Sequence, residues 1–285
     1  MRLKPKKSTR TRLLIVLAIL AAAVLFDAVI YEPRFPQLNT YDVAIPNLPA
    51  DLDGFRIVQL SDIHRRRFVA DSAIRRAVEM ANATNPDAVV LTGDYVGRDP
   101  ANIEPCFDML CKLKSRLGSY AVLGNHDHWT GAKAVSDSIT RHHITLLDNA
   151  GTKLGAGLYL AGIDDQWAGS PNVDAAFGGV PKDAACVMLS HTPKAVPLFA
   201  GHNGLLITGH THGGQVNIPF IPRKCLPGLS GRPYVDGWYK EGDILMYVNR
   251  GIGTINPPVR FFCRPEVTLY VLHPASDGQA RVVNM

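Results

Sequence analysis

The sequence is poor in cysteine, and the spacing of its cysteines excludes one common kind of metal site. There are five, namely Cys106, Cys111, Cys186, Cys225 and Cys263. None of them forms a C-x-x-C pair, so a structural zinc site built on cysteine is not expected. An odd number also excludes a complete set of intramolecular disulfides, and cysteine content therefore leaves the cellular compartment open.

The chain also lacks internal repeats and low-complexity tracts, and only 19% of its residues are charged, against 46% that are hydrophobic. This balance is typical of a globular protein with a large core and excludes disorder of the whole chain. Much of the net charge of +5 comes from six basic residues near the start: Arg2, Lys4, Lys6, Lys7, Arg10 and Arg12. Without them the chain is about neutral, so no nucleic-acid partner is expected from charge.

An apolar run follows this basic tail. Residues 13–26 are all apolar, and residues 28–30 extend the run past Asp27 to about the length that a bilayer span requires. We interpret residues 1–12 as a cytoplasmic tail and residues 13–30 as a single-pass transmembrane signal anchor. A cleaved secretory signal is the alternative. The positive-inside rule predicts that the rest of the chain lies on the non-cytoplasmic side of the cell membrane, periplasmic or extracellular.

The segment after the anchor is rich in proline. Residues 31–53 contain Pro33, Pro36, Pro46 and Pro49 between short apolar stretches. This pattern predicts an extended connector rather than a helix, because proline disfavours helical backbone at the residue before it. We expect the connector to space a single domain, residues 54–285, from the membrane.

Short apolar runs that end abruptly in Asp, Asn or His recur from Gly54 onward. Five such runs occupy residues 56–60, 88–91, 120–123, 186–189 and 205–208. Their composition predicts buried strands. Helical apolar stripes at residues 74–81 and 106–113 separate the first three runs. Right-handed crossovers would make these three strands parallel, and ligands collect at the carboxyl ends of such strands.

The second half of the chain is richer in strands than in helices. Residues 158–161, 244–248 and 267–272 each predict a strand. A second sheet packed on the first is the natural arrangement for them. The expected fold class is therefore α/β (α+β) with two packed sheets.

Polar side chains stand directly after the apolar runs, where chemistry is expected. Asp62 and His64 follow the first run, and residues two apart in extended backbone point to the same side. Later runs are followed by Asp94, Asn125, His126, Asp127, His191, His210 and His212. A single fragment of this kind is more often structural than functional, but the joint occurrence of all of them in this order indicates a common site.

Seven of these residues form a coherent set of metal ligands: Asp62, His64, Asp94, Asn125, His191, His210 and His212. They offer only oxygen and nitrogen donors. The set is too large for one tetrahedral ion and suits two divalent ions that share an aspartate. Manganese, iron and zinc are the candidate metals.

This motif series resembles that of the calcineurin-like metallophosphoesterases, which reads D-x-H, G-D, G-N-H-[DE], H and G-H-x-H. The resemblance covers about residues 54–273, and no element is missing. It implies a four-layer αββα sandwich of two mixed β-sheets that hydrolyses phosphoesters by activating water at a dinuclear metal centre. It further implies one ion on Asp62, His64, Asp94 and His212 and a second on Asp94, Asn125, His191 and His210.

The resemblance also implies catalytic roles for His126, which would protonate the leaving oxygen, and for Asp127, which would orient it. The extended motif at residues 209–215 and the apolar N-terminus are similar to a bacterial branch of membrane-associated phosphodiesterases. Some members of that branch hydrolyse UDP-2,3-diacylglucosamine in lipid A biosynthesis. Purple acid phosphatases require a tyrosine where this chain has Gly97, so we set that branch aside.

Several arginines are candidates for substrate binding. Arg65, Arg66 and Arg67 directly follow the first metal motif and suit a second phosphate or a lipid headgroup, with a solvated basic loop as the alternative. Three later residues are further candidates: Arg250, Arg260 and Arg264.

We therefore expect a phosphodiesterase or pyrophosphatase that acts on a phosphoester small molecule or a lipid-linked substrate near the membrane, such as UDP-2,3-diacylglucosamine. A nucleotide phosphodiesterase or nuclease is one alternative, because the same metal motifs serve those reactions. A non-catalytic, metal-holding envelope-binding module is another. The N-terminal anchor argues against the first alternative, and a histidine beyond the ligand set, His126, argues against the second.

Overall fold

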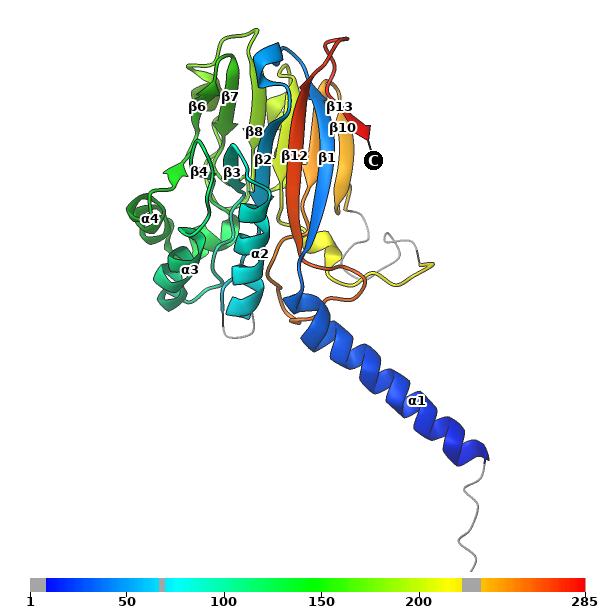
Figure 1. The fold of residues 1–285 in the computed structure, drawn as a ribbon. Helices are drawn as coiled ribbons and strands as arrows, with labels where there is room; N and C mark the ends of the chain where they lie inside the picture. The colour runs from blue at the N-terminus through cyan, green and yellow to red at the C-terminus, as the bar shows by residue number, and fades with distance from the viewer. Residues whose placement is uncertain (1–8, 67–69, 222–231, 285) are drawn as a thin grey trace, which may run out of the picture.

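The computed structural model describes residues 9–66, 70–221 and 232–284. Two mixed β-sheets form its centre, as expected (Figure 1). The first has the strand order β13-β1-β12-β2-β3-β4-β5. Its strands are β1 (Gln37–Ile45), β2 (Phe55–Leu60), β3 (Ala88–Leu91), β4 (Ser119–Ala121), β5 (Thr145–Leu146), β12 (Glu266–Pro274) and β13 (Arg281–Asn284).

The second sheet has the order β10-β11-β9-β8-β7-β6. Its strands are β6 (Ala150–Gly155), β7 (Leu158–Gly162), β8 (Ala185–Leu189), β9 (Gly204–Thr208), β10 (Gly237–Glu241) and β11 (Ile244–Val248). The helices are α1 (Thr9–Phe26), α2 (Asp71–Ala83), α3 (Ile103–Leu110), α4 (Asn125–Arg141) and α5 (Val173–Phe177). Short helical turns are η1 (Asp27–Tyr31), η2 (Glu32–Arg34), η3 (Ala50–Leu52), η4 (Pro100–Asn102), η5 (Pro193–Phe199) and η6 (His212–Gly214).

Three apolar clusters hold these elements in four layers. One cluster lies between the sheets and includes Ile57 from the first and Leu205 from the second. Another packs α2, α3 and α4 on the outer face of the first sheet and includes Phe107. The third covers the outer face of the second sheet with α5 and η5 and includes Phe199. This is the αββα arrangement that the motif series implied.

The five predicted runs form β2, β3, β4, β8 and β9, and the two helical stripes form α2 and α3. Strands β2, β3 and β4 are parallel, as are β7, β8 and β9. The carboxyl ends of the strands in each group therefore meet at one edge of the sheet. The last predicted strand is the exception: β12 belongs to the first sheet, antiparallel to β2, and not to the second sheet.

The expected connector at residues 31–53 is wrong for its central part. Residues 37–45 form β1, which pairs with β12 along its whole length and with β13 on its other side. The prolines that suggested a connector, Pro36 and Pro46, stand just outside the strand, where a missing N–H removes no ladder hydrogen bond. The globular domain therefore begins before Gly54, and little chain separates it from α1.

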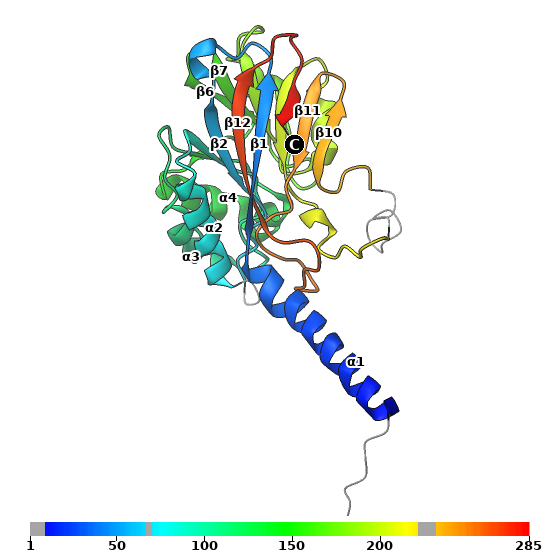
Figure 2. The ribbon, with the colours of Figure 1, turned by 45° about the vertical axis from the view of Figure 1, so that its right-hand side comes forward.

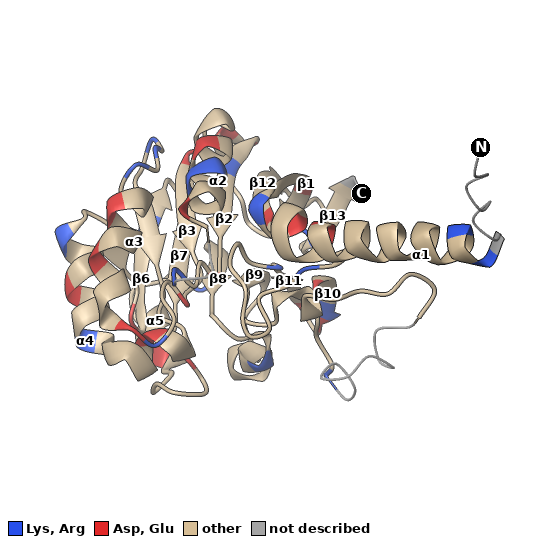
Figure 3. Ribbon diagram, turned by 90° about the horizontal axis from the view of Figure 1, so that it is seen from below, with Lys and Arg blue, Asp and Glu red and all other residues tan. Residues whose placement is uncertain are grey.

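Helix α1 projects from the domain in Figure 1 and Figure 2. With its continuation to Arg34 it is long and apolar enough to cross a membrane, and its apolar window is not buried by the rest of the protein. A signal sequence would have the same properties. Figure 3 shows basic residues at the outer end of α1 and no charged residue along its middle.

Candidate active site

All seven predicted ligands gather where the strands of both sheets end. Asp62 and His64 follow β2, Asp94 follows β3, and Asn125 opens α4 just after β4. The other three ligands come from the second sheet, one after β8 and two after β9: His191, His210 and His212. The site thus lies between the sheets, at one end of the sandwich.

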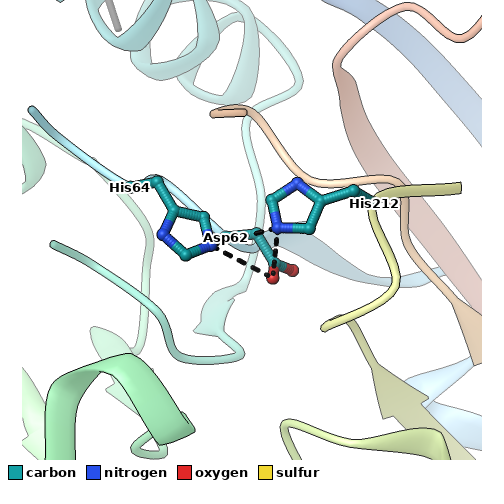
Figure 4. A group of neighbouring side chains, drawn as sticks. All are labelled: Asp62, His64 and His212. Carbon is teal, nitrogen blue, oxygen red and sulfur yellow. Dashed lines mark hydrogen bonds and ion pairs between the residues drawn. The ribbon is translucent and has the colours of Figure 1, made fainter. Parts of the chain in front are cut away.

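One group of ligands consists of Asp62, His64 and His212 (Figure 4). The Nε2 atoms of the two histidines lie 3.0 Å apart, and their rings stack with centroids 4.8 Å apart. The carboxylate of Asp62 faces both, with its Oδ1 atom 3.4 Å from Nε2 of His212 and 3.9 Å from Nε2 of His64. Two imidazole nitrogens and a carboxylate oxygen that converge in this way suit a divalent cation.

The second group consists of Asp94, His191 and His210. Nε2 of His191 lies 3.3 Å from Oδ2 of Asp94 and 3.1 Å from Nδ1 of His210. The same Oδ2 atom lies 3.3 Å from Nε2 of His64 in the first group. One carboxylate oxygen therefore faces both groups, which is the position that a bridging ligand must occupy.

Two further observations show that these residues fit metal ions. The side-chain oxygen of Asn125 is buried and has no hydrogen-bond partner within the described part of the chain, an arrangement that is costly unless a ligand supplies the partner. His191 donates from Nδ1 to the backbone carbonyl of Thr92 at 2.7 Å. This bond leaves Nε2 as the nitrogen that faces Asp94, so loss of the Nε2 proton would present a lone pair to a metal, as in many metal-binding histidines.

The backbone around the ligands is strained. Five ligands have a positive φ, between 44° and 72°: Asp62, His64, Asp94, His210 and His212. Non-glycine residues hold this conformation at a cost of about 1–3 kcal/mol each, and such residues cluster at functional sites. Close packing maintains the strain: a Cβ atom at Gly209 would lie 2.4 Å from Oδ2 of Asp62. Only glycine fits there.

Burial and neighbouring charges shift the pKa values of the ligands in different directions. Burial raises the pKa of Asp62. Burial would also raise the pKa of Asp94, but the charges and hydrogen bonds of His191 and His64 outweigh it and hold that pKa well below its usual value. Burial and repulsion from His191 lower the pKa of His210 to about 3. A carboxylate that stays ionised and a histidine that stays neutral are the forms that bind metal.

His126 lies beside the two groups, and a ring nitrogen of it lies close enough to His64 and Asp94 to form a third possible metal-binding group with them. Its ring contacts those of His64 and Trp129, with centroid distances of 4.7 and 4.8 Å, and its backbone N–H donates to Oδ1 of Asp94 at 2.8 Å. Burial lowers the pKa of His126 to about 4, so its imidazole is neutral at pH 7. A neutral imidazole can still donate an N–H to a leaving oxygen.

Asp127 does not orient His126, contrary to expectation. Its carboxylate accepts hydrogen bonds from the backbone N–H groups of Asp94, Tyr95 and Gly124, at 2.8–2.9 Å. It stands in the first turn of α4, where a carboxylate commonly accepts the N–H of the residue that caps the helix. Asp127 therefore positions the backbone of the bridging residue Asp94, rather than the neighbouring ring.

The arginines after the first motif have protein partners. Arg65 pairs with Asp71, Nε to Oδ1 at 3.1 Å, and donates to Asn102 at 2.8 Å. Arg66 donates to the backbone carbonyl of Thr254. Arg67 lies outside the described residues. Substrate binding by Arg65, Arg66 and Arg67 stays a prediction.

The later arginines also have protein partners. The interpretation as a substrate contact is wrong for the fully buried Arg260 and stays a prediction for Arg250 and Arg264. Arg250 pairs with Glu266 at 2.8 Å, and Arg264 donates to the carbonyl of Phe35 at 2.9 Å. Arg260 is fully buried and donates to backbone carbonyls of residues 250, 251, 253 and 263. A long cationic side chain satisfies these carbonyls, which belong to the loop that packs on Asp62 and His64.

Sequence analysis missed Trp167, which forms an aromatic rim of the site together with Trp129. The indole of Trp167 is 65% exposed and lies against His210 and Trp129, with centroid distances of 5.6 and 5.4 Å. Asp165 holds this loop by accepting the N–H groups of Trp167 and Ala168. A signal was available, because Asp165 follows the apolar run of β7 just as the ligands follow theirs.

A cavity of about 800 Å³ opens beside His210. Trp167 and Tyr234 give it aromatic walls, and Lys194 and Arg232 give it positive charge. Its size and charge suit an anionic substrate larger than a single phosphate.

Comparisons with known proteins agree with this geometry. A model of the calcineurin-like phosphoesterases matches residues 55–214. The chain is 30% identical over 249 residues to the metallophosphoesterase YkuE of Bacillus subtilis, covering 85% of this chain and 87% of that protein. It is 31% identical over 227 residues to the phosphodiesterase YaeI of Escherichia coli, covering 76% and 82% of the two chains.

Two other similarities are more distant. The UDP-2,3-diacylglucosamine pyrophosphatase LpxG of Chlamydia muridarum is 27% identical over 314 residues, covering 88% of this chain and 94% of that protein. Among solved structures, TT1561 of Thermus thermophilus aligns with a TM-score of 0.48 and 16% identity, over 70% of this chain and 90% of that one. From the family match and the two relatives at 30% identity or more, we conclude that the chain belongs to the calcineurin-like phosphoesterases and is a phosphoester hydrolase.

Proposed function

We propose that this hydrolase cleaves phosphodiester or pyrophosphate bonds with two divalent cations and that its substrate is lipid-linked, of the type of UDP-2,3-diacylglucosamine. The observation that carries the two-metal part is the position of Asp94, whose Oδ2 atom lies 3.3 Å from one histidine of each ligand group. Manganese, iron and zinc all suit the donor set.

When bound, two cations lower the pKa of water and draw charge from the phosphoryl oxygens. The residues of the chain do the remaining work. Asp62 and Asp94 hold negative charge against the metals, and the carbonyl of Thr92 accepts from Nδ1 of His191, which leaves Nε2 to face Asp94. His126 stands beside the ligands, where its neutral imidazole can donate an N–H hydrogen bond to the leaving oxygen, and transfer of a proton to that oxygen requires the imidazolium form.

Three observations support a lipid-linked substrate. Helix α1 can attach the protein to a membrane, and β1 joins it to the domain. Strand β1 begins at the end of the sheet where β2 finishes, because β1 is parallel to β12 and β2 is antiparallel to β12. The metal site lies at that end. The cavity beside His210 supplies Lys194 and Arg232 for a second phosphate. Similarity to LpxG points to the same chemistry.

Nucleotide phosphodiesterase activity is the second candidate. Trp129 and Trp167 favour it, because exposed indole rings stack on nucleobases at many sites. The two candidates differ in what lies beyond the scissile bond, an acyl-bearing sugar or a free nucleoside.

The test uses the full-length protein in lipid nanodiscs with manganese. The kcat/KM values for UDP-2,3-diacylglucosamine, for its deacylated soluble analogue, for free nucleotides and for single-stranded DNA are compared. We expect the acylated substrate to have the highest value. A preference for nucleotides or DNA would replace the proposal with the second candidate.

We also propose a single-pass topology with the catalytic domain on the non-cytoplasmic side, supported by the basic residues before α1. A topology reporter belongs after Met285, because an insertion near residue 50 would lie between β1 and β2, which both pair with β12. Activity of a periplasmic reporter supports this side. Activity of a cytoplasmic reporter reverses it.

A further inference from the structure

We propose that residues 216–221 and 255–262 form a membrane-contact surface beside α1, and that this surface seats the metal site at the boundary between lipid and water. The inference goes beyond the hydrolytic function and rests on the proposed membrane attachment through α1. The surface would contact the same bilayer that α1 enters.

The surface consists of apolar side chains that the described part of the chain leaves exposed. Five large ones are exposed: Ile218, Phe220, Ile221, Ile255 and Phe262. Phe220 is fully exposed, and Phe262 is 62% exposed. Neither segment contains an acidic residue. An apolar patch of this kind on a folded domain marks a site of interaction with a protein or a membrane.

Hydrogen bonds join the two segments into one surface. Val216 and Phe261 form an isolated β-bridge, and the backbone N–H of Asn217 donates to the carbonyl of Phe261 at 2.8 Å. The side-chain amide of Asn217 donates to the carbonyl of Phe262 at 3.1 Å. The exposed residues therefore belong to a connected structure rather than to two unrelated loops.

This surface is fixed to the inner end of the membrane helix. Glu32 is buried and accepts the backbone N–H groups of Phe262, at 2.9 Å, and of Cys263. The N–H of Arg260 donates to the carbonyl of Ala28, at 2.9 Å, within η1. These hydrogen bonds hold the surface next to α1. Because lipid that surrounds this helix would also reach the loop bound to it, we infer that the partner of the surface is the bilayer.

Neighbouring residues agree with a position at the membrane interface. Tyr31 is half exposed and stacks on Phe35 with a centroid distance of 4.4 Å, and tyrosine is enriched at the interfacial depth. Arg34 donates to the carbonyl of Ile30 at 2.6 Å. Figure 1 and Figure 2 both show the segment after β9 extending from the domain on the side where α1 leaves it.

The backbone at the two exposed phenylalanines is unfavourable for the domain alone. Phe220 has a φ of 68° and Phe262 a φ of 50°. Glycine or asparagine would relieve this strain, and an exposed ring contributes little packing within the domain. Insertion of both rings into the acyl region would offset the strain, which gives a physical reason for phenylalanine at these positions.

The surface lies directly behind the metal ligands. Cys263, the neighbour of Phe262, donates from Sγ to the carbonyl of His212 at 3.3 Å. Gly253, two residues before Ile255, packs against His64. A lipid contact at this surface would therefore hold the ligands at the depth of phosphoesters in the headgroup layer.

The contact is tested by tryptophan fluorescence with the full-length protein, one chain per nanodisc, in lipids brominated near the headgroup. Phe220→Trp and Phe262→Trp are compared with Val283→Trp, an exposed apolar position on β13. The emission of Trp129, Trp167 and Trp238, recorded with the unsubstituted protein, is subtracted. We expect loss of the added emission at positions 220 and 262 and none at 283. Equal quenching at all three positions, or at none, would overturn the proposal.

A kinetic comparison tests the consequence for catalysis. Phe220→Ser combined with Ile221→Ser should lower kcat/KM for an acylated substrate in vesicles about tenfold or more, because burial of one phenyl side chain is worth at least that factor. Hydrolysis of a soluble nitrophenyl phosphodiester should not change, and Val283→Ser should change neither rate. Equal loss with both substrates would make the two residues structural and overturn the proposal. If the unsubstituted protein hydrolyses neither substrate, the proposed function fails, while the quenching experiment still decides the membrane contact.

Discussion

The two ends of the sandwich differ in which residues adopt a backbone conformation with positive φ. At the end opposite the metal site, positive φ angles fall mostly on residues that tolerate them, such as Asn47, Gly54, Asn85, Gly118 and Gly157. At the metal end positive φ angles also fall on five of the ligands themselves, all of them aspartate or histidine. Strain is thus concentrated where a bound cation can offset it.

Polar groups follow the same division. At the opposite end, His273 contacts Asp53 and Asp42, and Arg116 contacts Asp87. At the metal end, buried polar atoms of Asn125, His126 and several other site residues have no partner within the described chain. Charged groups at the opposite end thus have partners within the protein, whereas several buried polar atoms at the metal end need a ligand as a partner. Substitutions at the two ends should therefore have different consequences.

The largest difference is expected for paired aspartate substitutions. Asp94→Asn removes the shared charge and should lower turnover by at least about 10³-fold, more than one oxyanion-hole donor contributes. Metal content, measured by mass spectrometry of the purified protein, should fall as well. Asp53→Asn at the opposite end is the control and should change neither. An active Asp94→Asn protein with full metal content would remove the distinction between the two ends.

His126→Gln tests whether His126 acts on the leaving group rather than as a metal ligand. Metal content should stay nearly constant, because the ring of His126 is not required by either proposed ligand set. Esters with poor leaving groups should slow by about 10²–10⁴-fold, the usual contribution of general acid catalysis, whereas nitrophenyl esters should slow far less. Equal slowing of both classes would argue against the acid role.

A buried arginine at the metal end and an exposed arginine at the opposite end should contribute differently to the free energy of unfolding. Arg260→Met leaves several buried carbonyls without a donor, and each such group costs about 1–3 kcal/mol. The free energy of unfolding should fall by several kcal/mol, measured by denaturation of the detergent-solubilised chain. Arg116→Met, at an exposed pair with Asp87 at the opposite end, should cost less than about 1 kcal/mol. Similar losses for both variants would contradict the structural role of Arg260.

The smallest expected effect concerns pH at the opposite end. Burial disfavours the charged form of His273, but its hydrogen bonds to Asp53 and Asp42 and the charges of both carboxylates together outweigh this and raise its pKa. A raised pKa in the folded state stabilises the protein below the unfolded value near 6.5, and this stabilisation is lost as pH rises through the folded value. His273→Gln should therefore cost up to about 1 kcal/mol at pH 5.5 and less at pH 9. An equal cost at both values would show that the imidazolium is not the stabilising form.

The metal end could be predicted from the sequence because its signal is local. An apolar run that stops at aspartate or histidine marks both a buried strand and the residue at its end. This rule found the strands that lead to Asp62, Asp94, His191 and His210. The α/β order and the layers followed from the same runs.

The remaining features depend on partners far apart in the chain. Strand β1 pairs with β12, which lies more than 200 residues later in the chain. The sequences of the two segments contain no pattern that predicts this pairing. Asp127 was assigned to its neighbour His126, although its hydrogen bonds go to the backbone of Asp94 and Tyr95. The exposure of Trp167 could not be predicted either, because the sequence does not distinguish a rim tryptophan from a packed one.

The most direct test of the central claim is the number of ions needed for turnover. The full-length protein is stripped with a chelator and titrated with manganese, while bound metal per chain and hydrolysis of a nitrophenyl phosphodiester are followed together. We expect activity to rise as the second ion binds and to reach its maximum at two ions per chain. Full activity with a single ion per chain would contradict the role of Asp94 as a bridge between two metals.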